Sequence, residues 1–332
     1  MEKQTVTIYD VAERAGVSMA TVSRVVNGNQ NVKPATRKKV MEVIEELDYR
    51  PNAVARGLAS KRTTTIGVIM PEIDNTFFAN LANGISDIAA MYHYDILLAT
   101  IDGNHNNDVT VFNSLLAKQV DGIVYIGYYL SERLYHEFTR SRTPIVLAGT
   151  QDQCHKIPSV NINHLQAAKE VVSMLAAHNE KVALVCGPLT EFINGHEYLA
   201  GYKEALKEQN RDYFEGLVFE SPYTLEGGKR LANRLLASGA TAAFVTDDLL
   251  AIGLLNELTD TGHRVPDEME IVSANNTIYT EIARPRLTSV EHSLYDIGAV
   301  AMRLLTKLIN GDDIADTEIV LPHSLIIKDS SK

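Results

Sequence analysis

The sequence predicts a small all-α head followed by a large, two-lobed α/β body built on parallel sheets. Three observations support this prediction. Helix-capping residues and helical periodicity fill residues 1–50, whereas near-continuous apolar segments alternate with helical ones after residue 65. The charge divides at the same place, because residues 1–62 carry eleven Lys and Arg against seven Asp and Glu, while the rest carries 20 against 35. A head of net charge +4 on a body of −15 indicates a nucleic-acid partner for the basic end.

The composition argues against several classes of protein. No apolar run of 18 residues occurs, and the polar start MEKQTVTIYDVAERAG has no signal-peptide core. Cys154 and Cys186 stand far apart, which favours neither a disulfide framework nor a zinc site. No phosphate-binding loop, dinucleotide fingerprint or hydrolase motif is present. We therefore expect a cytoplasmic protein that is not an enzyme and that needs no cofactor or metal.

Two short helices joined by a tight turn are expected between residues 7 and 28. Thr7 is a good N-cap with Asp10 as its capping-box partner, and Gly16 is placed to end the first helix with a positive φ. Ser18 caps the second helix, which an Asn-Gly stop signal ends. This is the sequence form of a helix-turn-helix, although an ordinary αα-corner packed in a core is the alternative.

The outer face of the second helix favours DNA recognition over the αα-corner. Short side chains let a helix sit deep in the major groove, and hydroxyl groups can contact phosphates. Arg24 can reach guanine O6 and N7 with its planar guanidinium. The face consists of Ser18, Met19, Ala20, Thr21, Ser23 and Arg24.

A third helix is expected to begin at Pro34 and to seal the head with an apolar stripe. The stripe consists of Val40, Val43, Ile44 and Leu47. Arg37, Lys38 and Lys39 on its first turn are either a solvated face or contacts to backbone phosphates.

Residues 51–64 predict a marginal hinge helix and a linker. A helix of fewer than ten residues that contains Gly57 is unstable alone, so we expect it to fold on binding. Leu58 would then be exposed and could wedge between base steps in the minor groove, although a plain linker is the alternative. Further expected DNA contacts are Thr7, Asn31, Tyr49, Arg50 and Ala59.

The stretches TIYDVAERAGVSMATVSRVVNG and YRPNAVARGLASKRTTTIGVIMP resemble the lactose/galactose-repressor family over residues 5–71. The resemblance implies a homodimer with a periplasmic-binding-protein-like body. It also implies that Met19, Ala20 and Arg24 read bases and that Leu58 is the intercalating hinge leucine. The expected domains are a head (1–50), a hinge (51–64) and a body (65–332), with a first lobe at about 65–161 and 292–322 and a second at about 162–291 and 323–332.

The body is expected to contain two parallel sheets, since some 270 residues exceed what one such sheet holds. Helices are expected at 78–91, 167–177 and 249–259. In open parallel sheets ligands bind outside the carboxyl ends of strands, so a cleft between the lobes is the default site. The expected strands are 66–70, 96–100, 122–126, 144–147, 160–162, 182–186, 242–246 and 271–274.

The cleft is not expected to bind a sugar tightly. In sugar-binding relatives an arginine after GPL and an aspartate in a later turn hold the ligand, and the matching positions here are His196 and Asn275. Both charge-assisted contacts are therefore missing. Asp247 and Asp248 either serve the cleft or cap the following helix, and capping is the favoured interpretation. A weak sugar-phosphate effector stays open as an alternative ligand.

The stretch SLYDIGAVAMRLLTKLING predicts a helix with a cationic clamp. Arg303 and Lys307 lie one turn apart on the face that also carries Asp296, and such a pair suits a phosphoryl group. On the residues alone, a solvated amphipathic face is the better interpretation. The resemblance, to family members that control carbon catabolite genes, instead implies docking of the phosphocarrier HPr phosphorylated on serine. The expected docking residues are Tyr295, Asp296, Arg303 and Lys307, with Met91 and Tyr92 across the gap between the lobes.

Together these features predict a homodimeric, sequence-specific DNA-binding regulator of carbon catabolite repression and activation. It would bind pseudo-palindromic operators under the control of serine-phosphorylated HPr. The alternative is a repressor of a single sugar operon, induced by a small sugar in the cleft.

Overall fold

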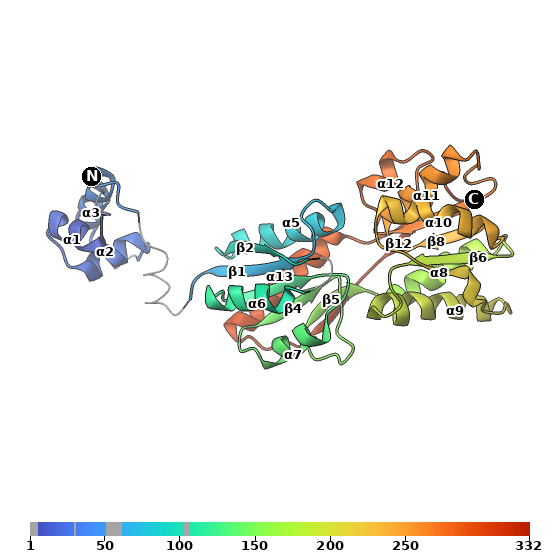
Figure 1. Cartoon of the computed structure of the whole chain (residues 1–332). Helices are drawn as coiled ribbons and strands as arrows, with labels where there is room; N and C mark the ends of the chain where they lie inside the picture. Colours follow the sequence, from blue (N-terminus) through green and yellow to red (C-terminus); the bar gives the residue numbers. More distant parts are fainter. Residues whose placement is uncertain (1–5, 30, 51–61, 103–105) are drawn as a thin grey trace. The chain divides into compact units, whose positions relative to one another are not determined.

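The computed structural model describes residues 6–29, 31–50, 62–102 and 106–332, and the chain divides into two units, Met1–Thr63 and Thr64–Lys332 (Figure 1). None of the helices in these described ranges is long and apolar enough to cross a membrane. The predicted hinge helix, with Leu58 and Ala59, lies outside the described residues.

The first unit contains three helices, α1 (Ile8–Ala15), α2 (Met19–Val26) and α3 (Pro34–Glu46). The Asp10 carboxylate accepts hydrogen bonds from the backbone N and the hydroxyl of Thr7, both at 2.7 Å. Gly16 ends α1 with φ +62°, and the Ser18 hydroxyl accepts from the backbone N of Thr21 at 3.2 Å. These caps and this turn set the angle between the helices, which pack around one core. The core consists of Val11, Ala12, Ala15, Val22, Val25, Val40 and Val43.

The second unit begins with a six-stranded parallel sheet in the order β11-β5-β4-β3-β1-β2. Helices α5 and α13 pack on one face of it, and α6 and α7 pack on the other. The strands are β1 (Thr65–Met70), β2 (Asp95–Thr100), β3 (Gly122–Ile126), β4 (Ile145–Ala148), β5 (Ser159–Ile162) and β11 (Glu318–Leu321). The helices are α5 (Thr76–Met91), α6 (Asp108–Ala117), α7 (Glu132–Arg140) and α13 (Leu294–Asn310).

The second sheet of the same unit has the order β12-β10-β9-β8-β6-β7, in which only β12 runs antiparallel to its described neighbour. Its strands are β6 (Val182–Cys186), β7 (Val218–Glu220), β8 (Ala242–Val245), β9 (Glu270–Ala274), β10 (Thr288–Glu291) and β12 (Ser324–Ile326). Its helices are α8 (His164–Ala176), the π-helix Ile193–Tyr198, α9 (Leu199–Glu208), the 3-10 helix Glu215–Leu217, α10 (Leu225–Ala237), α11 (Asp248–Asp260) and α12 (Ile278–Ile282).

The chain passes between the two sheets three times. It leaves the first sheet after β5 to enter α8, returns from β10 to α13, and leaves again from β11 to β12. These three connections form the hinge between the lobe around the first sheet and the lobe around the second.

Two glycines let α5 and α13 touch backbone to backbone. A Cβ added to Gly84 would lie 2.0 Å from the carbonyl oxygen of Tyr295, and one added to Gly298 would lie 2.0 Å from that of Leu81. Backbone atoms cannot rotate out of the way as a side chain can, so the helices would have to separate.

We expect Gly84→Ala to lower the free energy of unfolding by about 1–3 kcal/mol or more, because it overpacks this helix contact. Urea unfolding monitored by circular dichroism measures the loss. Ser86→Ala, at an exposed position of the same helix, is the matched control, and equal stability of the two variants would show that the helices are not in close contact.

Candidate nucleic-acid interface and regulatory surfaces

The α2 helix presents most of its predicted DNA-reading face to solvent. Ser18, Met19, Ala20 and Arg24 are exposed. Thr21 and Ser23 are half-buried, and their hydroxyls contact neighbouring side chains within the helix-turn-helix. The accessible part of this face is therefore small and nearly uncharged, with one guanidinium near its middle.

Arg24 differs from three other cations of the head. Arg14, Lys38 and Arg50 lie 2.6, 3.9 and 3.7 Å from acidic side chains of the same unit. Within the described part of the head, no acidic side chain pairs with Arg24. Its donors are therefore free to meet an external acceptor, as base readout requires.

The other predicted contacts divide into two groups. Thr7, Asn31 and Arg50 are exposed, whereas Tyr49 is half-buried and packs against the core of the head. Arg37, for which phosphate contact is one of two interpretations, donates to the backbone carbonyl of Asn29. It therefore positions the loop between α2 and α3.

The predicted docking surface for a phosphoprotein does not span the gap between the lobes. That expectation was wrong, because α5 and α13 pack on the same face of the first sheet. Met91 and Tyr92 at the end of α5 therefore share a lobe with Tyr295, Arg303 and Lys307 on α13.

The C-terminal ends of α5 and α13 lie at the same edge of the first sheet. Helix α5 runs from the end of β1 to the start of β2, so it ends at the amino edge of the sheet, where Asp95 pairs with Thr65. Helix α13 ends at the same edge, since a Cβ on Gly122, the first residue of β3, would lie 2.9 Å from side-chain atoms of Leu305 and Ile309. The chain also enters this unit there, at Thr64 and Thr65.

The surface combines exposed apolar groups with positive charge. Met91 is 69% exposed, and Tyr92 and Tyr295 are also exposed. Arg303 and Lys307 are exposed and have no ion-pair partner among the residues that the structure describes. Asp296 is exposed as well, and its backbone N donates to the capping hydroxyl of Ser293 at 3.2 Å. Tyr295 is oriented by a hydrogen bond that its hydroxyl donates to Asp87 at 3.0 Å.

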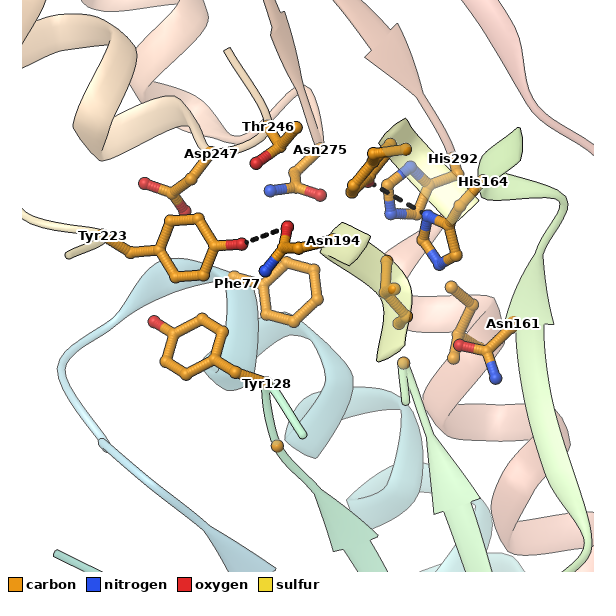
Figure 2. A pocket seen from close by; sticks show the side chains of 15 residues that line it. Phe77, Tyr128, Asn161, His164, Asn194, Tyr223, Thr246, Asp247, Asn275 and His292 are labelled. Atoms are coloured by element: carbon orange, nitrogen blue, oxygen red, sulfur yellow. Dashed lines mark hydrogen bonds between the residues drawn. The ribbon is translucent and has the colours of Figure 1, made fainter. Parts of the chain in front are cut away.

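A small cavity of about 50 Å³ lies between the lobes (Figure 2). Its lining is neutral except for Asp247, and its polar groups are amides, hydroxyls and imidazoles. The hydroxyl of Tyr223 donates to Oδ1 of Asn194 across it at 2.8 Å. The labelled residues are Phe77, Tyr128, Asn161, His164, Asn194, Tyr223, Thr246, Asp247, Asn275 and His292.

One of the two residues expected in this cleft lies elsewhere. His196 does not line the cavity: it is exposed and stacks on Phe192, with ring centroids 5.2 Å apart. The π-helix Ile193–Tyr198 instead directs Asn194 inward, and π-helical turns are frequent at functional sites. Asn275 does line the cavity, as expected.

The acidic pair before α11 bears out the expected capping at Asp247 and departs from it at Asp248. Asp247 is the N-cap and accepts from the backbone N of Leu250 at 2.9 Å, while it also lines the cavity, and burial raises its pKa to about 6. Asp248 does not cap the helix. It accepts from the backbone N and hydroxyl of Thr277, both at 2.7 Å, and burial raises its pKa to about 7.

A wider cavity of about 940 Å³ opens beside the first, between α7, the loop after β4 and the loop after β6. Sequence reasoning did not anticipate it. Its lining includes Glu132, Asp152 and Glu191, without a lysine or arginine among the described lining residues. Burial raises the pKa of Glu191 to about 7. An acidic lining of this kind disfavours phosphorylated sugars.

Comparison with known proteins agrees with both units. Residues 7–52 match the lacI family of bacterial regulatory proteins, and residues 171–331 match a periplasmic binding protein-like domain. The chain is 55% identical to catabolite control protein A of Streptococcus mutans over 328 residues, which cover 99% of this chain and 98% of the relative. The chain belongs to the lacI family of bacterial regulatory proteins.

Solved structures of lacI-family proteins show the same architecture. The transcription regulator CcpA of Lactococcus lactis is 45% identical, with a TM-score of 0.79, covering 82% of this chain and all of that one. The lac repressor dimer bound to operator is 28% identical, with a TM-score of 0.88, covering 98% and 99%. The predicted helix-turn-helix head and periplasmic-binding-like body are confirmed. The chain is a DNA-binding transcription regulator similar to catabolite control protein A, and such regulators are not enzymes.

Proposed function

We propose that this regulator binds pseudo-palindromic operators as a homodimer in the cytoplasm and controls carbon catabolite genes in response to serine-phosphorylated HPr. The observation that carries the proposal is the unpaired Arg303–Lys307 pair on α13, which shares an edge of the first sheet with Met91 and Tyr92. A phosphoserine carries a charge of about −2 and three acceptor oxygens, which match two free cations one helical turn apart.

The location of this surface gives a route to DNA binding. The chain from the head enters the body at the amino edge of the first sheet, where the backbone N of Thr64 donates to Asp121 at 3.0 Å. A partner docked on the ends of α5 and α13 lies at that same edge. It can therefore bias the segment that leads to the head without bridging the two lobes.

A two-fold dimer accounts for the operator symmetry. One head offers a single short recognition helix, so the contacts of one copy are few. Two copies related by a two-fold axis demand two half-sites in inverted order.

The cleft favours the phosphoprotein over a sugar as the main signal. The small cavity has room for only a few water molecules. Neither cavity lining contains an arginine or lysine among the described residues. A specific sugar-phosphate site needs a fixed cation for the phosphate, and these linings do not supply it.

Isothermal titration calorimetry of the full chain tests this proposal. Serine-phosphorylated HPr should bind with one site per protomer, whereas unphosphorylated HPr should bind at least about 100-fold more weakly, because a buried charge-assisted contact is lost. Tight binding of a free sugar, with no binding of the phosphoprotein, would support the single-operon repressor instead.

Two substitutions in the head test how it binds DNA. Arg24→Ala should reduce operator affinity by about 1–3 kcal/mol and relax discrimination at one base pair in each half-site. Lys38→Ala should weaken all DNA sequences about equally and reduce the dependence of binding on salt. Fluorescence anisotropy with a set of single-base operator variants separates the two effects, and identical sequence profiles for the two variants would rule out base reading by Arg24.

A further inference from the structure

Three histidines, each with a buried ring nitrogen, mark the three connections between the lobes. His164 begins α8 after β5, His292 lies between β10 and α13, and His323 lies between β11 and β12. Each connection between the two sheets thus carries one imidazole at the point where the lobes hinge.

The ring nitrogens of these histidines are only partly hydrogen-bonded. His164 and His292 are 7% and 6% exposed, and Figure 2 shows both on one side of the small cavity. Nδ1 of His164 lies 3.0 Å from the hydroxyl of Tyr198. Nε2 of His164, Nδ1 of His292 and Nε2 of His323 are buried without a hydrogen-bond partner.

Among the described residues, His164 and His292 have no carboxylate within ion-pair distance, whereas His323 has one. Glu170 on α8 is 3.3 Å from Nε2 of His323, in a geometry that forms no hydrogen bond. Asp247 lines the same cavity, but its carboxylate is engaged in capping α11. Other titratable groups beside His164 are the phenol of Tyr198, to which its Nδ1 is hydrogen-bonded, and the imidazoles of His292 and His323. No group of three metal ligands converges among the described residues.

We propose that these hinge histidines make the angle between the lobes sensitive to protons. In a second arrangement of the lobes, the three connections would move apart and water would reach the imidazoles. The imidazoles would then bind protons that they do not bind in the arrangement seen here. The body would therefore shift toward that second arrangement as the pH falls below neutral. This proposal concerns the body alone and does not depend on which corepressor binds it.

The direction and steepness follow from proton linkage. Burial, and then repulsion from the neighbouring imidazoles, lowers the pKa of His164 from 6.5 to about 3 and that of His292 from 6.5 to about 4. A hydrated imidazole has an ordinary pKa, so opening takes up as many as two protons between pH 6.5 and 4. The two imidazoles taken alone would raise the ratio of open to closed body by up to about 100-fold per pH unit in that window. The raised pKa values of Asp247 and Asp248 act in the opposite direction, so variants of the histidines themselves are needed.

Energy transfer between two dyes on one chain measures the angle. Cys154 is replaced by serine and Cys186 is buried, so dyes attach only at Arg133→Cys on α7 and Lys207→Cys on α9. Doubly labelled full-length chains are mixed with excess unlabelled protein, which removes transfer between protomers. We expect the transfer efficiency to change between pH 6.5 and 4. In His164→Gln/His292→Gln, the pH dependence of the ratio of open to closed body should lose the contribution of about two bound protons. His93→Asn, at an exposed position with φ +60°, is the control and should behave as wild type.

Constant transfer efficiency from pH 8 to 4 in the wild type would overturn the proposal, as would an unchanged transition in the double variant. If circular dichroism shows that the double variant is unfolded, nuclear magnetic resonance of the histidine rings in the wild type decides. The proposal then requires two rings that stay neutral until the transfer efficiency changes. Rings that all titrate near pH 6.5 without a change in transfer would refute it.

Discussion

Arg303→Glu is expected to abolish the response of operator binding to serine-phosphorylated HPr while leaving DNA binding without corepressor nearly intact. The substitution replaces an unpaired cation at an exposed position of α13 with a carboxylate. Attraction for a phosphoserine of about −2 charge becomes repulsion. Loss of one partner of a buried charge pair costs about 2–5 kcal/mol, so the affinity for the phosphoprotein should fall by about 30-fold or more.

A matched control is available on the opposite face of the same sheet. Arg140 is exposed at the end of α7, and Arg140→Glu makes the same change of charge away from α5 and α13. Titrations of operator DNA at fixed phosphoprotein concentration compare the two variants. A normal response in Arg303→Glu, or an equal loss in Arg140→Glu, would refute the assignment of the clamp.

Ile282→Asp is expected to dissociate the homodimer and thereby to reduce operator affinity. Ile278 and Ile282 lie one turn apart on α12 and are 57% and 61% exposed, which is unusual for large aliphatic side chains. Burial of one isoleucine contributes about 1.5–3 kcal/mol, and a two-fold axis repeats the contribution in the second copy. The dimer dissociation constant should therefore rise by about 100-fold or more.

Analytical ultracentrifugation measures this change directly. Phe214→Asp is the matched control, since Phe214 is also an exposed apolar residue of the second lobe but lies in the loop before β7. A dimer that survives Ile282→Asp but is lost in Phe214→Asp would place the interface elsewhere.

The head was predictable because its signals are local. A capping box at Thr7 and Asp10, a glycine with positive φ and a serine N-cap act within four residues, so the sequence alone shows them. The apolar seam follows from helical spacing around those fixed ends. The hinge prediction for residues 51–64 stays a prediction, as do the individual DNA contacts.

The body was predictable where strands are buried on both faces. Each of the eight expected strands is present within one residue of its expected ends. Seven of them are central parallel strands, which are continuous apolar runs, whereas β2 is a partly exposed edge strand that is itself a largely apolar run. The strands that were missed are short, and β7, β11 and β12 also lie at sheet edges with partly polar sequences. Their pairing depends on neighbours far away in the chain.

The errors in the candidate sites have equally physical causes. A π-helix shifts the register of residues 193–198, so Asn194 rather than His196 reaches the cavity, and periodicity based on the α-helix cannot show this. The contact of Gly84 with the Tyr295 backbone joins segments more than 200 residues apart. Without it, Met91 and Arg303 were expected on different sides of the gap between the lobes.

The central claim is that a phosphoprotein on the α5–α13 surface sets operator affinity. The most direct test is the operator dissociation constant of the wild-type full chain, measured at one salt concentration with serine-phosphorylated HPr, unphosphorylated HPr or a panel of sugars and sugar phosphates. A coupling of about 1–3 kcal/mol, or roughly 5–150-fold tighter binding, is predicted for the phosphorylated protein alone. Operator binding that changes with a free sugar and does not respond to the phosphoprotein would contradict the claim.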